Sequence, residues 1–86
     1  MSSYRVEFKK SAQKEVEALD ETSANRILSA IQRLEQNPRP DGCKKLKGMV
    51  DAYRIRVGER RVVYVVDDSQ LLVIVTKVAD RDEVYR

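Results

Sequence analysis

Four arginines, Arg54, Arg56, Arg60 and Arg61, fall within eight positions of the segment DAYRIRVGERRVVYVV, residues 51–66. A guanidinium group stays protonated at physiological pH and presents a planar fork of N–H donors that matches two phosphate oxygens. These residues therefore suit phosphate binding and the stabilisation of charge on a phosphate, rather than proton abstraction.

The segment reads as two strands joined by a tight turn at Gly58 and Glu59. Counting outward from the turn predicts the pairs Val57–Arg60, Arg56–Arg61, Ile55–Val62, Arg54–Val63 and Tyr53–Tyr64, with alternate side chains on opposite faces. One face then carries Tyr53, Ile55, Val62 and Tyr64, and the other carries Arg54, Arg56, Arg61 and Val63.

The predicted Arg56–Arg61 pair sets two like charges directly opposite each other. Such a pair destabilises a hairpin by up to about 1 kcal/mol, so folding alone gives no reason for it. A ligand with closely spaced negative charges would relieve the repulsion. We interpret this face as a phosphate-binding platform. Arginines that simply splay into solvent are the alternative.

The chain around this hairpin is strongly basic. Residues 39–61 hold eight basic and three acidic residues, a local charge of +5, whereas the whole chain of 86 residues has a net charge of +3. Concentrated positive charge favours a polyanionic partner, either nucleic acid or an acidic protein. A solvated basic face without a ligand is the alternative interpretation.

The composition argues against several other chemistries. The chain has no histidine and a single cysteine, Cys43, which excludes a disulfide, a Cys/His zinc site and a Cys–His nucleophile pair within one chain. There is no obvious carboxylate cluster, so we expect no metal and no small-molecule cofactor. Neither a signal peptide nor a membrane span is evident, so we expect a reduced, cytoplasmic setting away from membranes.

Hydrophobic spacing predicts a single α+β domain over residues 1–86. The expected elements are a strand at 4–8, a helix of about two turns with Ser11 as N-cap, a longer amphipathic helix at 24–36, a loop at 38–50, and strands at 52–57, 60–67 and 70–78. This β-α-α-β-β-β order predicts a mainly antiparallel four-stranded sheet with a helical hairpin packed on one face.

The last predicted strand is apolar on both sides. If Asp68 and Ser69 form the turn before it, Leu72, Ile74 and Thr76 join the arginine face, while Leu71, Val73 and Val75 face the helices. An apolar stripe beside positive charge suggests cover by an amphipathic acidic segment of a protein partner. A strand buried on both faces is the alternative.

Two stretches of the sequence resemble the RelE/ParE toxin superfamily of bacterial and archaeal toxin–antitoxin systems. The resemblance is carried by LKGMVDAYRIRVGERRVVYVV at 46–66 and VADRDEVYR at 78–86, and the order of elements matches over nearly the whole chain. Its most specific features are Leu46, Gly48, residues 53–56 and 61–64, and the spacing of Arg81 and Tyr85. The resemblance implies a small toxin that sits in the ribosomal A site and cleaves mRNA there, with a cognate antitoxin as partner.

The resemblance also implies site residues. Arg54, Arg56 and Arg61 stand where related toxins carry basic residues that bind the scissile phosphate, and Arg81 and Tyr85 match the pair near the family's C-terminus. Lys44, Lys45, Lys47 and Arg60 are then candidates for binding RNA or the ribosome.

In this interpretation the RNA 2′-hydroxyl is the nucleophile and guanidinium groups stabilise the charged phosphorane. Tyr85 is the carried-over group that could accept a proton, which needs its pKa, ordinarily about 10, to be lowered by nearby positive charge. Two features depart from the family pattern. Some relatives carry lysines where this chain has Arg54 and Arg56, and Asp80 stands where many carry histidine.

Two further functions remain open from the sequence. The first is a ParE-like toxin that inhibits DNA gyrase and cleaves nothing; the ending RDEVYR argues for the RelE type, because ParE-like toxins generally lack the tail tyrosine. The second is a domain that binds RNA or the ribosome without turnover.

Overall fold

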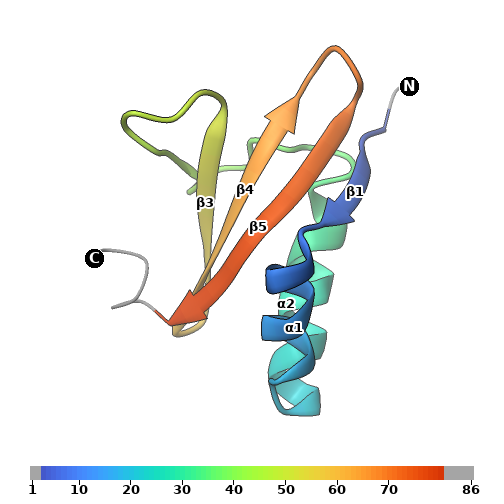
Figure 1. Ribbon diagram of the computed structural model, residues 1–86, viewed down its shortest axis with the longest axis vertical. Helices are drawn as coiled ribbons and strands as arrows, with labels where there is room; N and C mark the ends of the chain where they lie inside the picture. Colours follow the sequence, from blue (N-terminus) through green and yellow to red (C-terminus); the bar gives the residue numbers. More distant parts are fainter. Residues whose placement is uncertain (1–2, 81–86) are drawn as a thin grey trace.

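A computed structural model of the protein describes residues 3–80. Its elements are β1 (Arg5–Phe8), α1 (Lys10–Glu17), α2 (Glu21–Arg33), β2 (Lys44–Lys45), β3 (Ala52–Val57), β4 (Arg60–Asp67) and β5 (Leu72–Asp80). They form one five-stranded sheet in the order β1-β5-β4-β3-β2, with both helices on one side of it (Figure 1). This confirms the predicted α+β plan.

The sheet has one strand more than predicted. Lys44 and Lys45, expected in a loop, pair antiparallel with Arg54 and Tyr53 to form β2. Two residues are too few for an alternating pattern of apolar and polar side chains, which is the signal that reveals a strand in a sequence. The first strand, β1, runs parallel to β5, and the other pairings are antiparallel.

The two helices begin differently. The predicted N-cap at Ser11 is wrong, because α1 starts at Lys10 and its N-cap, Lys9, makes no side-chain capping bond. The N-cap of α2 is Asp20, whose carboxylate accepts a hydrogen bond from the Ser23 backbone N–H at 3.1 Å. Hydrogen bonds from the Ser23 side chain, and then from this backbone N–H, lower the pKa of the Asp20 carboxyl, because they stabilise its charged form.

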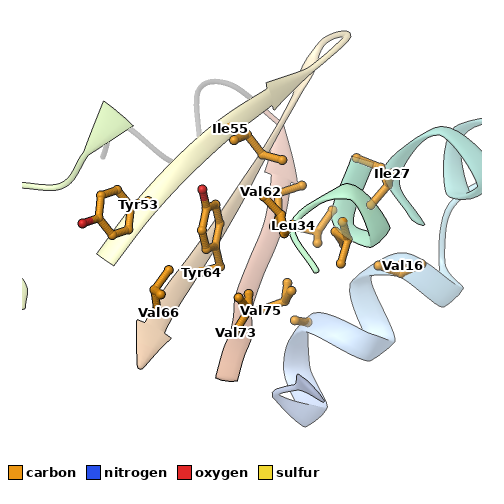
Figure 2. Close-up of a cluster of buried hydrophobic side chains, with 13 residues drawn as sticks. Val16, Ile27, Leu34, Tyr53, Ile55, Val62, Tyr64, Val66, Val73 and Val75 are labelled. Carbon is orange, nitrogen blue, oxygen red and sulfur yellow. The ribbon is translucent and has the colours of Figure 1, made fainter. Parts of the chain in front are cut away.

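The hydrophobic core lies between the helices and the sheet (Figure 2). From α1 and α2 it takes Val16, Ile27 and Ile31, and from the sheet it takes Tyr53, Ile55, Val62, Tyr64, Val66, Val73, Val75 and Val78. The sheet face that was predicted to pack against the helices is therefore the face that contributes to this core. Neither α1 nor α2 is both long and apolar enough to cross a bilayer.

The turn between β4 and β5 is longer than predicted. Asp67 pairs with Leu72, so four residues, 68–71, form the connection instead of two. Because the difference is an even number of residues, the predicted faces are kept: Val73 and Val75 are buried against the helices. Leu71 itself lies in the turn, with φ of 51°.

A β-bulge interrupts β5 and changes its alternation. Val63 pairs with Lys77 and Tyr64 pairs with Val75, so Thr76 is the extra residue. Its hydroxyl donates a hydrogen bond to the Val63 carbonyl at 3.2 Å. Beyond the bulge, the even-numbered Val78 faces the helices and Ala79 lies opposite Arg61, which shows that the face assignment changes along β5.

The apolar residues of the far sheet face are less exposed than predicted. Val63 and Leu72 are each 7% exposed, while Val65 and Ile74 are partly exposed. The expectation of an exposed apolar stripe is wrong for the first two. For these residues the alternative holds, in which the strands are buried on both faces.

Candidate nucleic-acid interface

The β3–β4 hairpin has the predicted register. Its pairs run from Val57–Arg60 to Tyr53–Tyr64, and Arg56 lies directly opposite Arg61. The turn begins at Gly58, whose φ of 63° is a left-handed value that glycine adopts without strain. Arg54, Arg56 and Arg61 therefore stand on the sheet face turned away from the helices, and we call these three residues the arginine platform.

The three side chains of the platform have different surroundings. Arg61 lies between Arg56 on β3 and Ala79 on β5 and is 7% exposed. Arg54 is half-buried and Arg56 is exposed. The Arg56 Nε donates to the Gly58 carbonyl at 3.2 Å, which turns this guanidinium toward the end of the hairpin. Arg61 is therefore enclosed by its neighbours, whereas Arg56 is open to solvent.

The unpredicted strand β2 extends the basic face. Lys44 pairs with Arg54, so it stands on the same face as the platform, whereas Lys45 pairs with Tyr53 and alternates to the other face. Lys44, Lys45 and Lys47 are all exposed. Of these candidates, the register brings Lys44 to the platform.

Arg60 does not join the platform. It pairs with Val57, which places it on the helix side of the sheet. There its Nη1 donates to the Ser23 hydroxyl at 3.3 Å, and its Nε lies 3.8 Å from an Asp80 carboxylate oxygen. These contacts connect the start of β4 to α2 and to the end of β5.

Arg81 and Tyr85 lie outside the described residues.

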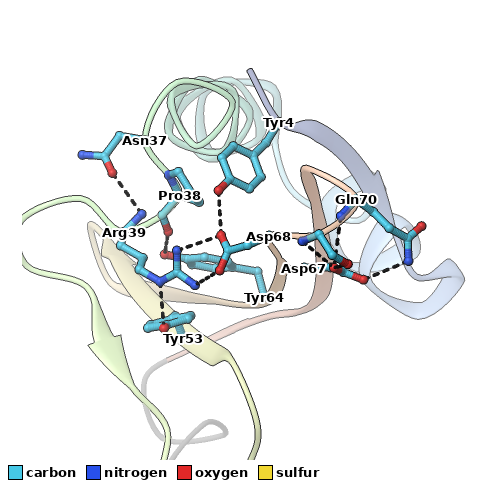
Figure 3. Close-up of polar contacts among 10 residues, drawn as sticks. Tyr4, Asn37, Pro38, Arg39, Tyr53, Tyr64, Asp67, Asp68 and Gln70 are labelled. Atoms are coloured by element: carbon cyan, nitrogen blue, oxygen red, sulfur yellow. Dashed lines mark hydrogen bonds and ion pairs between the residues drawn. The ribbon is translucent and has the colours of Figure 1, made fainter. Parts of the chain in front are cut away.

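A polar cluster anchors the segment that leads into β2 (Figure 3). Arg39 donates from Nη1 and Nη2 to the Asp68 carboxylate at 3.1 and 2.9 Å, and from Nε to the Tyr53 hydroxyl at 2.8 Å. Tyr4 donates to the same carboxylate at 2.6 Å. The cluster therefore connects the residue before β1, the strand β3 and the β4–β5 turn to the segment that carries the lysines. In the sequence, Arg39 is recognisable only as part of the local positive charge.

Tyr64 also anchors the segment that leads into β2. Its hydroxyl donates to the buried Pro38 carbonyl at 2.7 Å, and its ring stacks on Tyr53 with centroids 5.9 Å apart. Burial, with the nearby Cys43 thiol, raises the pKa of Tyr64 well above its ordinary value. Tyr64 thus remains a hydrogen-bond donor and does not serve as a base.

Tyr64→Phe is expected to lower the free energy of unfolding by about 1–3 kcal/mol, because the buried Pro38 carbonyl loses its donor. Denaturation by urea measures the change. Tyr4→Phe is the matched control. It should cost less, since the exposed Asp68 carboxylate keeps both of its bonds to Arg39. An equal loss in the two variants would contradict this account.

The cluster also predicts an acid dependence of stability. Hydrogen bonds from Arg39, and then from Tyr4, lower the pKa of the Asp68 carboxyl. A depressed pKa adds stability above the unfolded value, about 3.9 for Asp, and this stability is lost as the pH falls through the folded value. The melting temperature should therefore fall between pH 5 and pH 3, and it should fall less in Asp68→Asn. Parallel curves for the two proteins would refute the assignment.

Among residues 3–80, no three Asp, Glu, Cys or His side chains gather in a way that could hold a metal ion. The guanidinium and ammonium groups of the described interface can bind anions and neutralise their charge.

Comparison with known proteins identifies the family. The family described as the ParE toxin of type II toxin–antitoxin systems, parDE, matches residues 6–85. The chain belongs to the RelE/ParE toxin superfamily. It is 31% identical to the candidate toxin RelE1 of Methanocaldococcus jannaschii, covering 96% of both chains. It is 34% identical to a candidate RelE-like toxin of Escherichia coli, covering 95% of this chain and 90% of the relative.

The fold matches as well. The toxin in the crystal structure of the intact E. coli RelBE toxin–antitoxin complex superimposes with a TM-score of 0.81 at 30% sequence identity, covering 91% of this chain and 96% of that one. The chain is thus a RelE-type toxin of a toxin–antitoxin system by family.

Proposed function

We propose that this toxin is a metal-independent endoribonuclease that cleaves mRNA in the ribosomal A site and so inhibits translation. The observation that carries the proposal is the register of the β3–β4 hairpin, which sets Arg54, Arg56 and Arg61 on one sheet face with Arg56 opposite Arg61. Like charges placed opposite each other on a hairpin repel, and a bound phosphate would relieve that repulsion.

The proposed reaction uses the RNA's own nucleophile. The 2′-hydroxyl oxygen attacks the adjacent phosphorus, the bond from phosphorus to the 5′ oxygen breaks, and a 2′,3′-cyclic phosphate and a 5′-hydroxyl result. One proton leaves the 2′-hydroxyl and one reaches the leaving oxygen. The platform would stabilise the phosphorane charge, and Tyr85, which the family resemblance pairs with Arg81, is the candidate for proton transfer.

The proposal names the partners. The protein would bind mRNA and the ribosome through the platform and Lys44 on one sheet face, with Lys45, Lys47 and Arg60 as further contacts outside the platform. It would act in the cytoplasm, where translation occurs. Because the structural relative is a toxin in a toxin–antitoxin complex, we also propose a cognate antitoxin, whose acidic residues would complement the basic face.

Primer extension on mRNA translated with and without the purified protein tests the proposal. New stops within codons, appearing when ribosomes are present, are the expected result. A second candidate follows from the matching family, which is described as ParE toxin: inhibition of DNA gyrase. Loss of supercoiling activity with intact mRNA would support that candidate. Ribosome binding with neither effect would indicate a binding domain without turnover.

A further inference from the structure

An open hollow of about 400 Å³ lies where α2 passes the edge of β3. Its charged lining consists of three arginines: Arg26 and Arg33 from α2, and Arg56 from β3. Asn25 and Ser29 add polar groups, and Ala30 and Val57 complete the wall. The described residues that line it therefore include three cations and no acid. The hollow is distinct from the platform, although Arg56 contributes to both.

Helix geometry explains how α2 supplies two of these arginines. Positions 26 and 33 are seven residues apart, which is close to two helical turns, so both side chains stand on the same side of α2. The neighbouring side carries Ile27, Ile31 and Leu34 into the core. Burial of that stripe fixes the rotation of α2 and thereby directs Arg26 and Arg33 toward the β3 edge.

Two of the guanidinium groups converge on the hairpin turn. The Arg26 Nη1 lies 4.0 Å from the position that a Cβ would occupy at Gly58, and the Arg56 Nε donates to the Gly58 carbonyl. The resulting site has cations on both of its walls.

The charges in the hollow are poorly compensated. Within residues 3–80, neither Arg26 nor Arg33 forms an ion pair, and both are exposed. Glu59 belongs to an adjacent hollow, which it shares with Arg26 and Arg60, and Arg60 there is already near Asp80. An anion entering between Arg26, Arg33 and Arg56 would meet positive charge from three directions.

We propose that this hollow binds phosphate groups of an RNA backbone, as a second contact region that continues from the platform through Arg56. The inference rests on the proposed function. We argue for an RNA backbone as the occupant because three guanidinium groups and no carboxylate of the described residues line the hollow, and a row of phosphates carries the repeated negative charge that such a set of cations binds. Guanidinium forks, an amide and a hydroxyl all donate to phosphate oxygens.

The test is the double variant Arg26→Gln, Arg33→Gln, with Lys10→Gln, Lys14→Gln as the matched control. The control removes the same charge from exposed positions of α1. Binding to a fluorescent single-stranded 12-nucleotide RNA and sedimentation with mRNA-free ribosomes are both measured across salt concentrations. The double variant should bind about tenfold more weakly at 0.1 M salt. The negative slope of log K against log salt should become shallower by about 1.4, because two phosphate contacts are lost. The control should match the wild type.

The two binding measurements separate the sources of phosphate. Weaker binding of the oligonucleotide assigns the hollow to mRNA, and weaker binding of empty ribosomes assigns it to ribosomal RNA. Unchanged affinity and salt slope in both would overturn the inference, as would a selective loss of affinity for the antitoxin. If the wild type binds RNA but cleaves nothing, the proposed catalysis fails while the hollow remains testable by the same curves.

Discussion

Replacing Arg61 with glutamine is expected to reduce the rate of ribosome-dependent mRNA cleavage by about 100-fold or more. The reason is that one preorganised donor to a developing phosphorane charge contributes on the order of 10²–10³ in rate. Arg61 is the best-fixed member of the platform, because it is 7% exposed and stands on the central strand β4. Single-turnover cleavage on programmed ribosomes, followed by primer extension, measures the effect.

Three controls separate a catalytic loss from a structural one. Thermal unfolding of Arg61→Gln shows whether the substitution of this buried residue alters the fold. Arg61→Lys keeps the charge but loses the planar fork, so it should retain part of the rate. Arg5→Gln removes an exposed arginine from β1, near Glu7, and should cleave like the wild type. Full cleavage by a folded Arg61→Gln would exclude Arg61 from the site.

The register of the β3–β4 hairpin could be predicted because a two-residue turn fixes it. Once Gly58 and Glu59 were identified as the turn, the alternation of side chains assigned every residue of β3 and β4 to a face. The pairing of Arg56 with Arg61 confirms the count. The strand β5 illustrates the limit, since Thr76 enters a bulge that no alternating pattern reveals.

Features that depend on contacts distant in the sequence were not predictable in this way. β2 forms because Lys44 and Lys45 pair with the edge of β3. β1 pairs in parallel with β5, although the two strands are separated by most of the length of the sequence. The bonds of Arg39 to Tyr53 and Asp68 likewise join segments that are far apart in sequence. Local propensity carries no information about such contacts, because tertiary packing decides them.

The candidate interface shows the same division. The concentration of positive charge in residues 39–61 correctly indicated the segment that contains the platform and Lys44. The same count also included Arg60, although its register places it on the helix side. Arg26 and Arg33 lie outside residues 39–61, and nothing in the sequence distinguishes them from other arginines on a helix surface. Their proximity to the edge of β3 becomes evident only in the structure. Spatial gathering, rather than density along the sequence, identifies the hollow between α2 and β3.

Arg56→Glu is expected to change stability and activity in opposite directions. It replaces the repulsion between Arg56 and Arg61 with an attraction across β3 and β4, worth up to about 1 kcal/mol for an opposed pair. For a domain of 60–100 residues, 1 kcal/mol raises the melting temperature by about 4–8 °C. Cleavage should fall by about 100-fold or more, because a carboxylate now faces the scissile phosphate.

Arg56→Gln is the matched neutral substitution, and it should fall between the wild type and Arg56→Glu in both melting temperature and rate. Melting curves and single-turnover cleavage on the same three preparations give the comparison. A site whose residues serve folding loses both properties together when they are changed, whereas a binding site assembled against its own electrostatic repulsion gains stability as it loses function. A less stable Arg56→Glu, or one that cleaves normally, would show that the opposed arginines do not form such a site.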